Sequence, residues 1–100
     1  MMRFTKEQEA LANSVEAAIQ AVTGLSAETL IEMRIRILQK HPPPNFRPGL
    51  LALMEGFQKL ARARGNDLIF DREDILSGKG EVAVVLGGSV IYPVKTNGRA

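Results

Sequence analysis

The stretch that decides the fold class is residues 81–94, which reads EVAVVLGGSVIYPV. Two runs rich in β-branched residues, 81–86 and 89–94, flank the pair Gly87-Gly88. A Gly-Gly pair between two such runs is typical of a two-residue β-hairpin turn, because both turn positions require a positive φ. This turn predicts three cross-strand pairs: Val85 with Val90, Val84 with Ile91, and Ala83 with Tyr92. We therefore expect a C-terminal β-hairpin with strands over about 81–86 and 89–94.

The chain before this hairpin shows helical periodicity, with apolar residues recurring every three or four positions. Three helices are predicted over about 5–23, 26–40 and 48–64. Ser26 is a typical N-cap, and Gly24 and Gly65 are typical residues just beyond a helix C-terminus. A short strand is expected over about 68–70, followed by one helical turn capped by Asp71. The predicted fold class is α+β, with three N-terminal helices, a short strand and the hairpin.

Length and composition indicate one small domain. The chain has 100 residues, which suits a single core, and we expect residues 95–100 to form a flexible tail. The longest apolar run, residues 82–86, is far shorter than the roughly 20 residues that span a bilayer. The first seven residues lack the apolar stretch of a secretory signal. We expect a cytoplasmic protein without a membrane partner.

Motifs for catalysis, cofactors and metals each require a characteristic spacing of residues, which this sequence lacks. Gly78-Lys79-Gly80 is not followed by the Ser or Thr of a phosphate-binding loop. The acidic residues between 67 and 74 do not have the spacing of an EF-hand. One His and no Cys do not supply the ligands of a transition-metal site. The sequence therefore predicts a protein that is not an enzyme, with no catalytic residues, no cofactor and no metal.

Three features of the predicted elements point to surfaces that one core would not cover. Ala10, Ser14, Ala17 and Ala21 form a ridge of small residues on the first helix, at spacings that would let another helix approach closely. The apolar residues of the helix over 26–40 cover more than half its circumference, which predicts two packing partners. Both faces of the hairpin are apolar, and the face with Val85, Val90 and Tyr92 lacks a predicted cover.

Arg34 projects from the apolar arc of the helix over 26–40. Burying an unpaired guanidinium is costly, so this side chain must pair with a carboxylate, reach solvent along its stem, or bind an anionic ligand. The first two alternatives are structural and the third is functional.

These surfaces favour a protein-interaction module of regulatory or adaptor type, with a homodimer as the expected assembly. The predicted partner is another protein or a second copy of the chain. The predicted interaction surface comprises Ala10, Ser14, Ala17, Ala21, Arg34, Val85, Val90 and Tyr92.

A nucleic-acid-binding protein of winged-helix type is the alternative, since three helices followed by a hairpin have that order. Residues 41–64 carry four bases against one acid, and the predicted contacts are Arg47, Lys59, Arg62 and Arg64. Three features disfavour it. The connection before the third helix exceeds the three- or four-residue turn of helix-turn-helix motifs. The hairpin from 82 to 94 carries no Lys or Arg, and the net charge of the chain is only +2.

Overall fold

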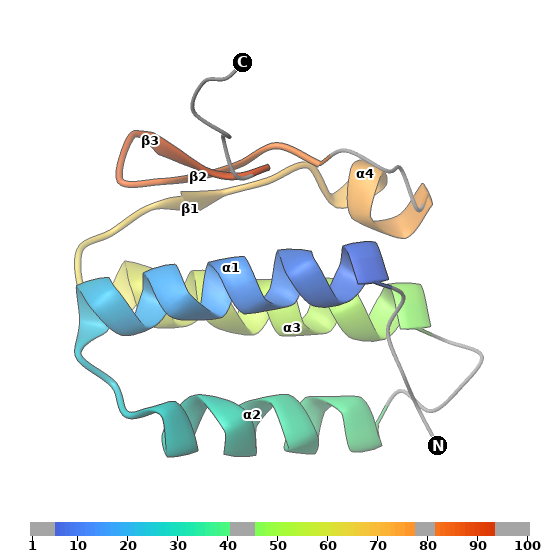
Figure 1. The fold of residues 1–100 in the computed structure, drawn as a ribbon, viewed down its shortest axis with the longest axis horizontal. Helices are drawn as coiled ribbons and strands as arrows, with labels where there is room; N and C mark the ends of the chain where they lie inside the picture. The colour runs from blue at the N-terminus through green and yellow to red at the C-terminus, as the bar shows by residue number, and fades with distance from the viewer. Residues whose placement is uncertain (1–5, 41–45, 78–81, 94–100) are drawn as a thin grey trace.

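The computed structural model describes residues 6–40, 46–77 and 82–93. Its elements, in chain order, are α1 (Lys6–Thr23), α2 (Ala27–Gln39), α3 (Phe46–Ala63), β1 (Leu68–Ile69), α4 (Arg72–Ser77), β2 (Val84–Leu86) and β3 (Ser89–Tyr92). The fold is mixed α+β, as the sequence predicts, with three long helices followed by a short strand and a hairpin (Figure 1).

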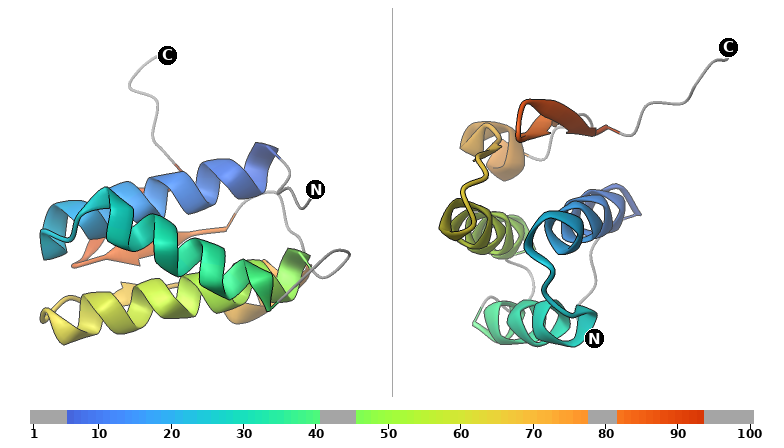
Figure 2. Two further views of the ribbon diagram at one scale, coloured as in Figure 1. Left: turned by 90° about the horizontal axis from the view of Figure 1, so that it is seen from below. Right: turned by 90° about the vertical axis from the view of Figure 1, so that its left-hand side faces the viewer.

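The elements form three layers (Figures 1 and 2). An antiparallel sheet in the order β1-β2-β3 makes the first layer. The pair α1 and α3 makes the second, with β3 packed over α1 and β1 over α3. The third layer is α2, which contacts α3 and α1 on the side away from the sheet. The central helices therefore have neighbours on both sides, whereas the sheet and α2 each have an outer face.

The core lies mainly between the sheet and the two central helices. Leu11, Val15 and Ile19 line the buried side of α1 at four-residue spacing. Phe57 of α3 is fully buried, as is Val84 of β2. Leu30 is the buried residue of α2, with Met33 and Ile37 packed against the same cluster. One continuous core thus joins all three layers.

The helix ends confirm the predicted capping residues. The Ser26 side chain accepts a hydrogen bond from the Thr29 N–H at the start of α2. After α3, the Gly65 N–H donates to the Arg62 carbonyl and the Asn66 N–H to the Ala61 carbonyl, which is a Schellman motif. The Glu73 N–H donates to Asp71 Oδ1 at 2.8 Å, so Asp71 caps α4 as predicted.

The start of α3 differs from the prediction. The helix begins at Phe46, two residues before the predicted start at Pro48. Proline is tolerated there because the first N–H groups of a helix have no intrahelical partner to lose.

The hairpin register confirms one predicted pair and corrects two. Val85 pairs with Val90 as predicted, around a turn in which Gly87 and Gly88 have φ of 59° and 85°. Val84 pairs with Tyr92 rather than Ile91, so the predicted pairing of Ala83 with Tyr92 is also wrong. A register shift between Val84 and Val85 leaves Ile91 as an extra residue in β3, as in a β-bulge. The bulge brings Tyr92 to the inner face, where it packs against the core.

The strands are also shorter than predicted. The structure has 84–86 and 89–92 in place of 81–86 and 89–94, and β1 ends at Ile69 rather than at residue 70. Residues 81 and 94, and the predicted tail over 95–100, lie outside the described residues.

Candidate interaction surfaces

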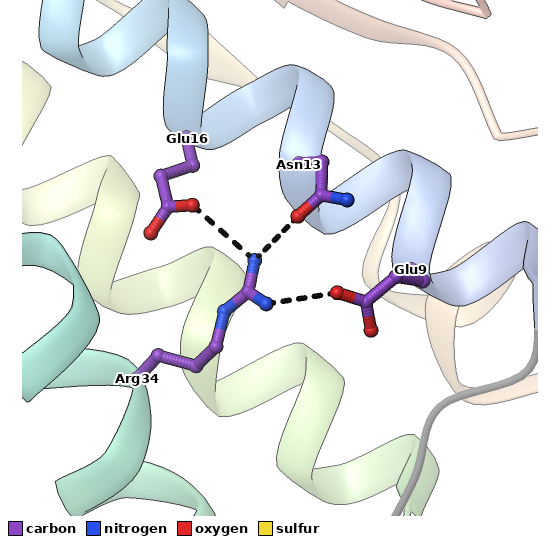
Figure 3. A network of polar contacts seen from close by, with 4 residues as sticks. All are labelled: Glu9, Asn13, Glu16 and Arg34. Atoms are coloured by element: carbon purple, nitrogen blue, oxygen red, sulfur yellow. Dashed lines mark hydrogen bonds and ion pairs between the residues drawn. The ribbon is translucent and has the colours of Figure 1, made fainter. Parts of the chain in front are cut away.

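Arg34 of α2 is held by three side chains of α1 (Figure 3). Its Nη1 lies 3.1 Å from Glu9 Oε2, and its Nη2 lies 3.1 Å from Asn13 Oδ1 and 3.5 Å from Glu16 Oε1. The side chains of Arg34 and Glu16 are only 18% and 19% exposed. The ion-paired interpretation of Arg34 is thus confirmed, and its guanidinium joins two helices of the same chain.

The partners of Arg34 were missed in the sequence, although a signal for them exists. Glu9, Asn13 and Glu16 follow one another at spacings of four and three, which places them on one face of α1. That face could have been matched to the single charged residue in the apolar arc of α2. The periodicity of a helix shows which of its faces is buried, but it does not show which other helix packs against that face.

The small-residue ridge of α1 is not covered by a described helix. Ala10, Ala17 and Ala21 are exposed, and Ser14 is half-buried. They lie on a different side of the helix from Leu11, Val15 and Ile19, which face the core. Within the described residues, the ridge therefore does not serve the close helix contact that its spacing suggests.

The close helix contact occurs at Gly56 of α3 instead. A Cβ placed on Gly56 would lie 3.2 Å from Ile37 Cδ1 and 3.5 Å from Met33 Sδ, both on α2. The missing side chain allows α2 to pack directly against the backbone of α3. This explains a glycine inside a helix, where it costs about 1 kcal/mol relative to alanine.

The outer face of the sheet carries three aliphatic side chains in one row, which we call the sheet strip. Ile69 of β1 pairs with Val85 of β2, which in turn pairs with Val90 of β3, so all three lie on the same face. Ile69 is 55% exposed, Val90 is 49% exposed, and Val85 between them is half-buried. The neighbouring pair of the same two strands, Leu68 with Leu86, is buried on the inner face.

The sheet strip differs from the predicted apolar face of the hairpin in two respects. Tyr92 is not part of it, because the bulge moves this residue to the inner face. Ile69 belongs to it but was not predicted, because only the sheet topology places β1 beside β2. Val85 and Val90 are brought together as the hairpin turn predicts.

The outer face of α2 is a second apolar surface. Contacts with α3 and α1 confirm that this helix has two packing partners. Ile31 and Ile35 are nevertheless 48% and 52% exposed, and Leu38 is half-buried. The helix itself lies on the side of α1 and α3 away from the sheet (Figure 1).

Three of the four basic residues of the alternative function lie at or just beyond the C-terminal end of α3, and Arg47 lies at its other end. Arg64 donates from Nη1 to the Thr23 carbonyl at 3.1 Å and so caps the C-terminus of α1. Lys59 and Arg62 are exposed near the end of α3. Arg47 lies about 18 Å from Lys59 along the helix axis, from the 1.5 Å rise per residue. α3 is contacted by α1, α2, α4 and β1, while Lys59 and Arg62 stay exposed near its end.

The described residues contain neither a membrane-spanning helix nor a metal-binding cluster. None of their helices is long and apolar enough to cross a membrane. They contain no group of three or more His, Cys, Asp or Glu side chains that could hold a metal ion. Comparisons with protein-family models, with curated proteins and with solved structures found no match for this chain.

Proposed function

We propose that this protein is a non-enzymatic protein-interaction module that acts as a homodimer, with the sheet strip as the contact surface. The observation that carries the proposal is the row of Ile69, Val85 and Val90 across all three strands on the outer face. An antiparallel sheet with one solvated face ordinarily alternates apolar inside and polar outside. In this sheet the outward-facing residues of the pairs Ile69–Val85 and Val85–Val90 are all aliphatic. This favours a partner that covers them.

A second copy suits the sheet strip chemically. Its three residues are uncharged, so a two-fold axis through the strip opposes no like charges within it. Branched aliphatic side chains of two facing sheets interdigitate at a spacing of about 10 Å. The strip can therefore be its own complement.

The size of the strip sets the expected strength of the association. Full burial of a Val or Ile side chain contributes about 1.5–3 kcal/mol, and these side chains are already partly covered. Two strips in contact would contribute about 6 kcal/mol before the cost of immobilising two molecules. Because that cost is at least about 4 kcal/mol, the two strips leave no more than about 2 kcal/mol, so other residues of the facing sheets must add to the contact. We therefore expect a weak dimer that dissociates on dilution.

Light scattering after size exclusion, over a series of protein concentrations, tests this function. The unchanged protein should approach the mass of a dimer as its concentration rises. Val90→Lys should remain a monomer throughout, because each subunit would then bring an ammonium group into the apolar contact. Ile35→Lys is the matched control: it replaces an equally exposed aliphatic residue of α2 and should leave the dimer intact.

Three outcomes would contradict the proposal. The first is a monomer at every concentration for the unchanged protein. The second is a dimer that survives Val90→Lys. The third is loss of the dimer in Ile35→Lys alone, which would place the contact on α2. Circular dichroism of each variant shows whether the fold is retained.

The same samples with added duplex DNA test the alternative function. Nucleic-acid binding would appear as an affinity that falls steeply with salt, and Lys59→Ala with Arg62→Ala should reduce that slope. Without duplex binding at low salt, this alternative is excluded.

A further inference from the structure

We draw no further inference here: the strongest candidate, the apolar surface patch of Ile31, Ile35 and Leu38 on α2, carries none, because nothing in the structure shows what covers it.

Discussion

At the residue scale, Arg34 shows how one charged side chain joins two helices. Replacing Arg34 by alanine should lower the free energy of unfolding by about 1–3 kcal/mol, because it leaves the largely buried Glu16 carboxylate without its cation. Exposed ion pairs contribute up to about 1 kcal/mol to stability, and breaking a fully buried one costs about 3–5 kcal/mol. The expected loss lies between these values because both side chains are partly exposed. Urea denaturation followed by circular dichroism measures it.

Two further variants separate the ion pair from other effects of losing Arg34. Adding Glu16→Gln to Arg34→Ala should restore part of the lost stability, because an amide is less costly than a carboxylate to leave without a cation. Arg36→Ala, on the exposed side of α2, should change stability by no more than about 0.5 kcal/mol. If Arg36→Ala lowered the free energy of unfolding as much as Arg34→Ala, the loss would come from a general effect on α2 and not from the ion pair between Arg34 and Glu16.

Gly56 is the second residue on which helix packing depends. Gly56→Val should destabilise the protein by about 1–3 kcal/mol, because the branched side chain would push against Ile37 and Met33 of α2. Gly56→Ala should lie within about 1 kcal/mol of the unchanged protein, since its better helix propensity offsets a contact with the movable end of Ile37. Thermal unfolding of the two variants measures both changes in stability. Equal stability of Gly56→Val and Gly56→Ala would contradict the close contact between α2 and α3.

At the scale of elements, the turn between β2 and β3 sets the register of the hairpin. Both turn residues have positive φ, which a side chain with a branched Cβ rarely adopts. Gly88→Val should therefore destabilise the protein by about 1–3 kcal/mol, measured by chemical denaturation. Gly87→Asn should be tolerated much better, because asparagine adopts the left-handed conformation at small cost. Comparable losses from both would show that the turn conformation is not the cause.

The elements also show how far local signals extend. The caps at Ser26 and Asp71 and the Gly-Gly turn were predicted correctly, because each depends on contacts within a few residues. The bulge at Ile91 was not predicted. It gives Tyr92 a place against the core, and that place exists only once α1 lies beneath β3.

At the scale of the whole molecule, the sheet and α2 are the two outer layers. Among the described residues, no further layer covers the outer face of either one. If the sheet strip joins two copies, the midpoint of thermal unfolding should rise with protein concentration, because association stabilises only the folded state. Val90→Lys should abolish this dependence while Ile35→Lys retains it. Differential scanning calorimetry over a hundredfold range of concentration tests the expectation, and a midpoint independent of concentration in the unchanged protein would contradict it.

The sequence by itself determined the helices, the position of the hairpin and the fold class, because capping, periodicity and turn conformation act over a few neighbouring residues. It also indicated that Arg34 needs a partner and that the chain has more apolar surface than one core covers. The tertiary structure decided which carboxylates pair with Arg34, that Ile69 joins Val85 and Val90 in one row, and that Tyr92 turns inward. Each of these depends on segments distant in the chain coming together, and the face an apolar residue presents to solvent is settled only by that packing.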